Sequence, residues 1–250
     1  MNILEIIEDA KAKKAKKLSL NNLELLVLPE ELFTLDFLEE LSLDENNLVE
    51  IPEEISNLKN LKKLSFGYND VMELPESIGA LKNLETLYMG YNCLSELPKS
   101  VKNLKNLQMV NIAQNQLQEL PEEIQNWQNL EKLSLHDNVL TELPEALWTI
   151  KKLRKLYLDN NNIESISPSI QNAKSLEVLV ISGNQLQEIP AETGNLAHLK
   201  ELILDRNHIE TLPDSLKNCP ELKTISLVEN QMQSSEAEKL SKALNIRIDV

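Results

Sequence analysis

The 250-residue chain is poor in the residues that usually form turns, disulfides and aromatic cores: it has 5 Gly, 2 Cys and 4% aromatic residues. Hydrophobic residues still make up 42% of it, so Leu and Ile must form the interior. An aliphatic interior of this kind suits stacked repeats better than a globular core built on large aromatic anchors. No run of about 18 apolar residues exists, so the sequence predicts no membrane-spanning helix.

Basic residues are also scarce, because 25 Lys and Arg stand against 40 Asp and Glu and leave a formal net charge of -15. Nucleic acids and anionic membranes bind basic surfaces, so we expect neither as a partner. Cys93 and Cys219 lie far apart, and we expect no disulfide between them, which favours a reducing compartment. The N-terminus lacks the basic and apolar segments of a signal peptide. These features predict a cytoplasmic protein and leave secretion by a non-classical route open.

A repeat of 23 residues runs through the chain, with the pattern LxxLxLxxNxLxxLPxxIxxLxx, as in residues 84–106. A degenerate first unit begins at Ala15, so we expect ten repeats over residues 15–234, the last one partial. The leucines that open the other units are Leu38, Leu61, Leu84, Leu107, Leu130, Leu153, Leu176, Leu199 and Leu222.

Each part of the repeat predicts a structural element. The LxL segment alternates with a period of two, which indicates a short strand. The Pro suits the first position of an outer helical segment, whose apolar residues then pack inward. The sequence therefore predicts an α/β solenoid: a curved right-handed superhelix with a parallel concave sheet, short helices on the convex side and helical caps.

One Asn recurs in nine repeats, directly after the strand. Its amide can bond backbone groups of its own coil and of the adjacent coil, which stacking would otherwise leave unpaired. We interpret this column as a structural Asn ladder formed by Asn46, Asn69, Asn92, Asn115, Asn138, Asn161, Asn184, Asn207 and Asn230.

Both ends of the predicted solenoid carry capping sequences. Residues 1–14 predict an amphipathic capping helix, and residues 235–250 predict a helix that opens with a capping box at Ser235, followed by a strand. We therefore expect a complete protein. The basic run Lys11–Lys17 has two interpretations: a nucleic-acid or membrane patch, or the favourable C-terminal end of the cap helix, which the net acidity favours.

Two groups of side chains interrupt the small and polar residues of the predicted concave face. The tyrosine group is Tyr68, Tyr88, Tyr91 and Met109, with hollows expected beside Gly67 and Gly90. The valine group is Tyr157, Val178, Val180 and Ile203. Exposed Tyr and contiguous apolar patches are typical of contact surfaces, so we predict that both groups bind a partner.

Acidic residues and one His surround these groups: Asp44, Glu45, His136, Asp137, Asp159 and Asp205. They favour a partner with Lys or Arg. Alternatively, some of them pair with basic residues such as Lys63 on the same face.

His136 beside Asp137 and Asp159 is the one candidate for chemistry, either as a hydrolase base or as part of a metal site. Asp159 and Asp205 are two coils apart, or about 10 Å, which is too far for zinc ligands. No nucleophile is specifically placed beside His136. The sequence therefore predicts neither catalysis nor a cofactor.

The repeat resembles the intracellular 23-residue leucine-rich-repeat group, which includes the Ras-suppressor and Ras-binding scaffold proteins and many bacterial proteins. The segment from Ile3 to Lys11, followed by Leu18-Ser19-Leu20, is similar to the start of bacterial members. The resemblance implies a module that binds another protein through its concave face. It also implies a scaffold or signalling role. A self-associating structural protein, such as a homodimer, is the alternative.

Overall fold

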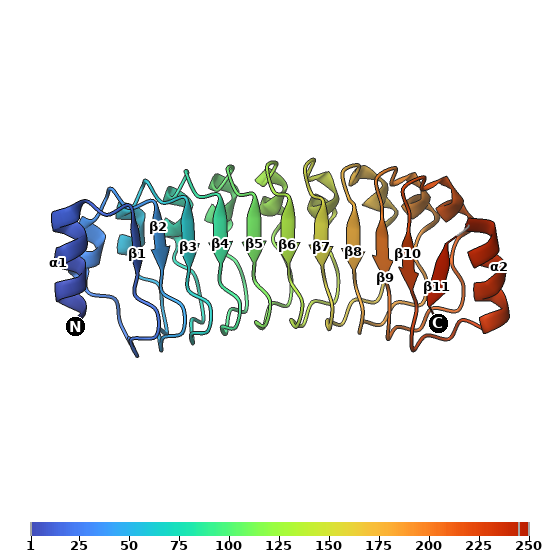
Figure 1. The fold of residues 1–250 in the computed structure, drawn as a ribbon, viewed down its shortest axis with the longest axis horizontal. Helices are drawn as coiled ribbons and strands as arrows, with labels where there is room; N and C mark the ends of the chain where they lie inside the picture. Colours follow the sequence, from blue (N-terminus) through green and yellow to red (C-terminus); the bar gives the residue numbers. More distant parts are fainter. Residues whose placement is uncertain (1, 245, 250) are drawn as a thin grey trace.

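The computed structural model describes residues 2–244 and 246–249, and they form a single arched row of coils (Figure 1). Each described coil contributes one three-residue strand to a parallel sheet in which the strands follow sequence order. Partners are one repeat apart, so Leu41 pairs with Leu64 and Leu64 with Leu87. The strands are β1 (Lys17–Ser19), β2 (Glu40–Ser42), β3 (Lys63–Ser65), β4 (Thr86–Tyr88), β5 (Met109–Asn111), β6 (Lys132–Ser134), β7 (Lys155–Tyr157), β8 (Val178–Val180), β9 (Glu201–Ile203), β10 (Thr224–Ser226) and β11 (Arg247–Asp249).

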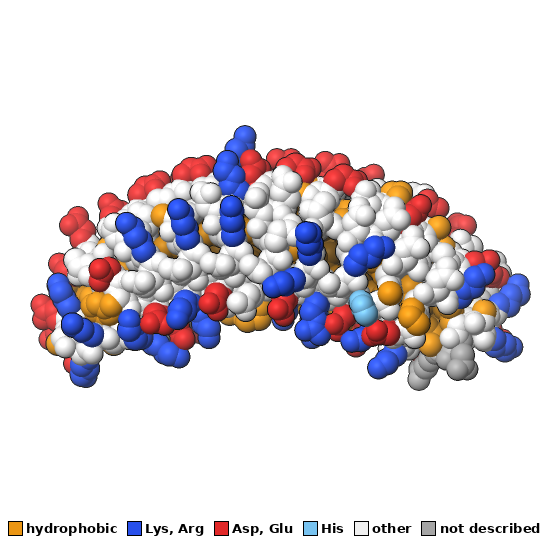
Figure 2. Space-filling model, turned by 90° about the horizontal axis from the view of Figure 1, so that it is seen from above, with side chains coloured by type: hydrophobic (Ala, Val, Ile, Leu, Met, Phe, Trp, Pro, Cys, Tyr) orange, Lys and Arg blue, Asp and Glu red, His pale blue; other side chains and the backbone are white. Residues whose placement is uncertain are grey.

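The opposite side of each of the first nine coils carries one short 3-10 helix, and these helices stack on one another behind the sheet. Figure 2 shows the resulting curvature, with the strands on the inner side of the arch. The helices are η1 (Glu30–Thr34), η2 (Glu53–Asn57), η3 (Glu76–Ala80), η4 (Lys99–Asn103), η5 (Glu122–Asn126), η6 (Glu145–Thr149), η7 (Pro168–Asn172), η8 (Ala191–Asn195) and η9 (Asp214–Asn218). This arrangement confirms the predicted fold class.

The repeated Pro lies one residue earlier than the sequence suggested. Pro52 precedes η2 with an extended backbone (φ -74°, ψ 160°), and its carbonyl accepts the first helical bond from Ile55 N–H at 3.1 Å. Pro fits this position because the helix start uses its carbonyl as an acceptor and does not need the N–H that Pro lacks. In η7, where Ser167 replaces this Pro, the Ser167 hydroxyl accepts a bond from Ser169 N–H at 3.1 Å, and Pro168 becomes the first helical residue.

Aliphatic side chains fill the space between the sheet and the helices in one continuous core. Leu61, Leu64 and Phe66 are fully buried, and so is Trp127, which the repeat pattern marks as oversized. The Trp127 indole fits because its Nε1–H donates to the Val101 carbonyl at 2.9 Å, one coil away. Burial of such columns is what stabilises each coil against the next.

The Asn ladder supplies the polar part of this stacking. Asn69 donates from Nδ2 to the carbonyl of Leu43 in the preceding coil and to that of Phe66 in its own coil, both at 3.0 Å. Its Oδ1 accepts from Leu48 N–H, also at 3.0 Å. Equivalent bonds recur from Asn46 to Asn230. The loops below the strands can therefore stay buried without orphaned backbone groups.

At the N-terminal end, α1 (Ile3–Lys13) covers the first coil with Ile7 and Ala10. Asn2 and Glu5 form a capping box at its start. The basic residues that follow meet acidic partners in the chain, namely Lys13–Asp9 at 2.7 Å, Lys16–Glu39 at 3.3 Å and Lys17–Glu40 at 2.9 Å. Lys11 and Lys13 lie in the last turn of α1, where the helix-end interpretation places them, whereas Lys16 and Lys17 pair with the next coil.

At the other end, α2 (Ser234–Leu244) buries Ala237 against the last repeat, and β11 pairs with β10. The helix begins one residue before Ser235, so Ser235 lies inside the first turn and cannot be the N-cap of the predicted capping box. Val250, the expected end of the last strand, lies outside the described residues. Within the described ranges, no helix has the length and apolar character needed to cross a bilayer.

Candidate functional site on the concave face

The tyrosine group forms an exposed aromatic surface over β3 to β5. Tyr68 has 55% of its surface exposed, and Tyr88 and Tyr91 are exposed as well. The Tyr68 and Tyr91 rings stack with centroids 4.1 Å apart and planes 11° from parallel. Tyr88 reaches the next coil, where its hydroxyl lies 3.9 Å from the Met109 sulfur. The four side chains therefore form two contacting pairs, Tyr68 with Tyr91 and Tyr88 with Met109, on adjacent coils of the same face.

Tyr68 and Tyr91 occupy an unusual backbone position. Their φ angles are 56° and 58°, in the left-handed region where a bulky side chain costs roughly 1–2 kcal/mol. Three other coils place Asn22, Asn160 and Gly183 at the same position, residues that adopt this conformation more easily, and the remaining coils place a charged or polar residue there, such as Gln114 or Arg206. Conformational stability alone therefore does not explain two tyrosines at these positions.

A hollow of about 440 Å³ lies beside Tyr88, over the first three strands. Its lining includes Ser19, Ser42 and Ser65 and the charged residues Lys17, Glu40 and Lys63. Glu40 bridges the two lysines, with Nζ–Oε1 distances of 2.9 Å and 3.8 Å. The sequence prediction missed this hollow, although three consecutive coils with Ser at one outward position, followed by Tyr, would have indicated it.

The predicted hollows beside Gly67 and Gly90 are not open, because both glycines are buried. A Cβ atom on Gly67 would lie 3.1 Å from the Gly90 carbonyl oxygen, and one on Gly90 would lie 3.1 Å from the Ala113 carbonyl oxygen. These glycines therefore serve the close approach of successive coils.

The valine group is much less accessible than its sequence suggests. Val178 is only 8% exposed, and Tyr157, Val180 and Ile203 are half-buried. The Lys132 ammonium lies 5.2 Å from the centre of the Tyr157 ring, in cation–π geometry. Burial raises the pKa of Tyr157. The prediction that Val178 offers a contact surface is therefore wrong, since the neighbouring side chains cover it.

Most of the predicted acidic rim forms hydrogen bonds within the solenoid. Asp44 Oδ1 accepts from Gly67 N–H at 2.7 Å and from the Ser65 hydroxyl, both one coil away. Asp205 repeats the arrangement further along, accepting from Val228 N–H at 2.9 Å. These carboxylates cap backbone N–H groups of the next coil. Glu45 is exposed, and its carboxylate has no hydrogen bond or ion pair with the described residues.

Family models of the leucine-rich repeat match most of this coil array. The "Leucine-rich repeat region" model covers residues 61–143, and the "Leucine rich repeat" model covers residues 174–232. Two further models of the same repeat match residues 128–172 and 37–58. The chain is a leucine-rich repeat protein. No match to a curated protein was found.

Three solved receptors resemble this leucine-rich repeat protein. The plant peptide hormone receptor RGFR1, solved in complex with RGF2, is 34% identical over 97% of this chain and 40% of the receptor chain, with a TM-score of 0.81. PEPR1, solved with AtPEP1, is 33% identical over 86% and 30% of the two chains, with a TM-score of 0.73. A TDR receptor is 25% identical over 98% and 44%, with a TM-score of 0.84. The present chain thus spans less than half of each receptor chain.

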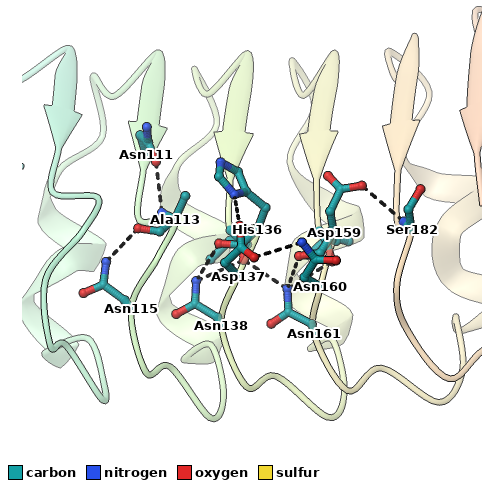
Figure 3. A network of polar contacts seen from close by, with 12 residues as sticks. Asn111, Ala113, Asn115, His136, Asp137, Asn138, Asp159, Asn160, Asn161 and Ser182 are labelled. Carbon is teal, nitrogen blue, oxygen red and sulfur yellow. Dashed lines mark hydrogen bonds and ion pairs between the residues drawn. The ribbon is translucent and has the colours of Figure 1, made fainter. Parts of the chain in front are cut away.

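The polar cluster of this leucine-rich repeat protein centres on His136 (Figure 3). His136 Nδ1 lies 2.7 Å from Asp137 Oδ2, and Asn160 Nδ2 donates to Asp137 Oδ1 at 2.9 Å. Burial opposes the ionised form of Asp137, but the bonds from His136 and Asn160 prevail and lower its pKa. Asp159 instead has a raised pKa because burial outweighs its bond from Ser182 N–H.

The hydrolase and metal hypotheses find no further support in this cluster. Ser134, the hydroxyl residue on the strand that precedes His136, is buried. Within the described part of the chain, no three His, Cys, Asp or Glu side chains are grouped so that they could hold a metal ion. The His136–Asp137 pair belongs to a polar contact that continues to Asn160 in the next coil.

Proposed function

We propose that this protein binds another protein on the N-terminal half of its concave face, with Tyr68, Tyr88, Tyr91 and Met109 as the main contacts. The single observation that carries the proposal is that three tyrosines on two adjacent coils are exposed, and that two of them, Tyr68 and Tyr91, stack on each other. Tyr supplies a large, partly polar contact area at a low cost in side-chain entropy, which is why it recurs at binding hot spots. The solved receptors RGFR1 and PEPR1, each in complex with its named ligand, support the same class of function.

The adjacent hollow gives the proposed site depth. A side chain of a bound segment would lie against Ser19, Ser42 and Ser65 while the neighbouring part of that segment contacts Tyr88. Tyr157, Val180 and Ile203 form a secondary contact region on the same face. Glu45 is the rim carboxylate best placed for a basic group of the partner, because it is exposed and unpaired among the described residues.

The test is affinity capture with the wild-type protein as bait, followed by quantitative mass spectrometry. A partner captured by wild type should fall at least tenfold with Tyr88→Ala, because loss of a central aromatic contact costs about 2 kcal/mol or more. Lys102→Ala, on the convex side in η4, is the matched exposed control and should capture the partner normally. Undiminished capture by both Tyr88→Ala and Val180→Asp would contradict a concave binding site.

Self-association through the same face is the second candidate function, because the exposed Tyr surface is also suited to a second copy. Sedimentation velocity at several concentrations distinguishes the two candidates. A dimer that disappears with Tyr88→Ala would favour self-association.

We further propose a non-catalytic scaffold or signalling role in the cytoplasm of a bacterial cell, with no nucleic-acid or membrane partner. The free thiols Cys93 and Cys219 and the net charge of -15 support these assignments. Fractionation of the source cell would test the location.

A further inference from the structure

A second exposed surface lies on the flank formed by the loops that follow the strands, along the lower edge of the molecule in Figure 1. One position of each coil, three residues before the Pro site in most repeats, changes character along this flank. The first three coils place Leu26, Val49 and Met72 there, followed by Ser95, Gln118, Thr141, Glu164, Gln187 and Glu210. The aliphatic character is thus confined to the N-terminal end.

These aliphatic side chains are open to solvent. Leu26 is 65% exposed and Met72 61%, with Val49 exposed between them. Val27 adds a further 67%-exposed side chain next to Leu26. Met72 N–H donates to the Val49 carbonyl at 3.3 Å, so the second and third coils are in direct contact at this position.

The C-terminal coils show that these positions share one surface. There, Gln187, Glu188, Glu210 and Thr211, at the corresponding positions, line a single hollow of about 460 Å³. Because the coils repeat every 23 residues, Leu26, Val49 and Met72 face solvent on the same side of the solenoid. The cap helix α1 packs against η1 on the outer side of the first coil. Nothing within the described residues therefore covers the aliphatic strip, which is unusual for several adjacent large apolar side chains.

A row of carboxylates runs beside the strip. The position after each aliphatic residue is Glu50 in the second coil and Glu73 in the third, and Glu96, Glu119 and Glu142 continue the row. These five side chains are exposed and have no ion pair with the described residues. An aliphatic strip and an acidic row therefore lie parallel along the solenoid.

This pairing fits a basic amphipathic helix. An α-helix rises 5.4 Å per turn, close to the spacing of about 4.8 Å between adjacent strands of a sheet. A helix lying along the flank can therefore place about one apolar residue and one basic residue at each coil. We propose that the flank of the first three coils binds a basic amphipathic helix of a partner protein, which covers Leu26, Val49 and Met72 and pairs its Lys or Arg with Glu50 and Glu73.

The experiment uses a fluorescein-labelled 18-residue helical peptide of Leu and Lys as the probe, with one apolar and one basic face. Fluorescence anisotropy measures its binding to the full chain. Two control peptides are the same sequence with Glu in place of Lys, and a permuted Leu/Lys sequence of equal charge without a continuous apolar face. We expect the amphipathic basic peptide to bind at least tenfold more tightly than either control.

Variants of the chain test whether the peptide binds to the flank. The triple variant Leu26→Gln, Val49→Gln and Met72→Gln, which introduces a residue found at this position in later coils, should weaken binding at least tenfold. The double variant Glu50→Gln and Glu73→Gln should weaken it several-fold and reduce its salt dependence. Thr141→Gln, at the same position in a later coil, and Tyr88→Ala on the concave face should leave binding unchanged.

Three results would overturn the proposal: no preference for the amphipathic basic peptide, unchanged binding by the triple variant, or a loss caused by Tyr88→Ala. A concentration-dependent dimer that the triple variant abolishes would also overturn it, because the occupant would then be a second copy of the chain. Circular dichroism melts of each variant establish that the changes act on binding and not on folding.

Discussion

The two apolar groups of the concave face lie on the same sheet and yet present different surfaces. Tyr88 and Met109 share their repeat positions with the valine group, whereas Tyr68 and Tyr91 occupy the left-handed position after the strand, where the valine group has no member. In the tyrosine group, the Tyr68 and Tyr91 rings stack on each other and leave their outer faces free. In the valine group, Val178 is covered and Tyr157 lies against the Lys132 ammonium. The comparison teaches that an outward position on a strand becomes a contact surface only when its side chain rises above its neighbours.

The largest expected effect is a difference in partner affinity between variants of the two groups. Tyr88→Ala should weaken the partner complex by about 2–4 kcal/mol, since it removes a central aromatic contact. Val178→Ala should change affinity by less than about 0.5 kcal/mol, because a covered side chain offers little surface to a partner. Titration calorimetry with the captured partner measures both. Equal losses would show that the valine group contributes as much as the tyrosine group.

A second prediction concerns the carboxylates that support both regions. Asp44→Ala should lower the free energy of unfolding by about 1–3 kcal/mol, because the Gly67 N–H of a buried residue loses its acceptor. Asp205→Ala should have a similar effect through Val228 N–H, whereas Asp44→Asn, which keeps an acceptor oxygen, should cost less. Urea denaturation gives the values. If Asp44→Ala weakens partner binding at unchanged stability, this carboxylate is a contact residue instead.

A third prediction separates binding from stability within the tyrosine group. The double variant Tyr68→Asn and Tyr91→Asn loses a stacked pair, which contributes roughly 0.5–1.5 kcal/mol. It also relieves two bulky residues of left-handed backbone, at a gain of roughly 1–2 kcal/mol each, which offsets or exceeds that loss. We therefore expect the free energy of unfolding to stay the same or to rise by up to about 3 kcal/mol, while partner affinity falls at least tenfold. A stability loss above about 2 kcal/mol would mean that the rings serve folding.

The smallest effect concerns the cluster that lies between the two groups. Asp137 has a lowered pKa, so its stabilising contribution is present above the ordinary Asp pKa and is lost as the pH falls through the lowered value. Asp159 has a raised pKa, so its ionisation destabilises the fold as the pH rises through that value. At pH 7, Asp137→Asn should therefore lower the free energy of unfolding, and Asp159→Asn should raise it. Denaturant titrations at pH 7 and pH 3 measure this, and equal signs for both variants would contradict the assignment.

The repeat made much of the fold predictable. The strand positions follow from the LxL alternation, and the 23-residue period fixes the pairing of Leu41, Leu64 and Leu87. The outer segments are 3-10 turns beginning after the Pro, because five residues between Pro and the next core Leu allow only one turn. Where each turn begins depends on which carbonyl accepts the first helical hydrogen bond. The residue types do not specify that carbonyl.

The candidate site was less predictable than the fold. It depends on how far each side chain extends above its neighbours and on whether it contacts the next coil. The alternation of a strand identifies Val178 and Tyr88 equally as outward residues, but the neighbouring coils decide which one is covered. The same limit hid the role of Asp44, whose side chain spans to the next coil. The sequence did not predict the flank strip. The repeat pattern places Leu26, Val49 and Met72 in the loops after the strands, and it does not specify which loop side chains are exposed.

One residue in each coil has left-handed backbone at the border of the inner face, from Asn22 through Tyr68 and Gly183 to Glu229. Its side chain is not needed in the core, and the series already accommodates an amide, an aromatic ring, a hydrogen atom and a carboxylate. The stack therefore carries a row of positions at which ligand preference can diverge while the scaffold stays the same. New specificities in such a molecule can arise coil by coil, without a change in the architecture that holds them.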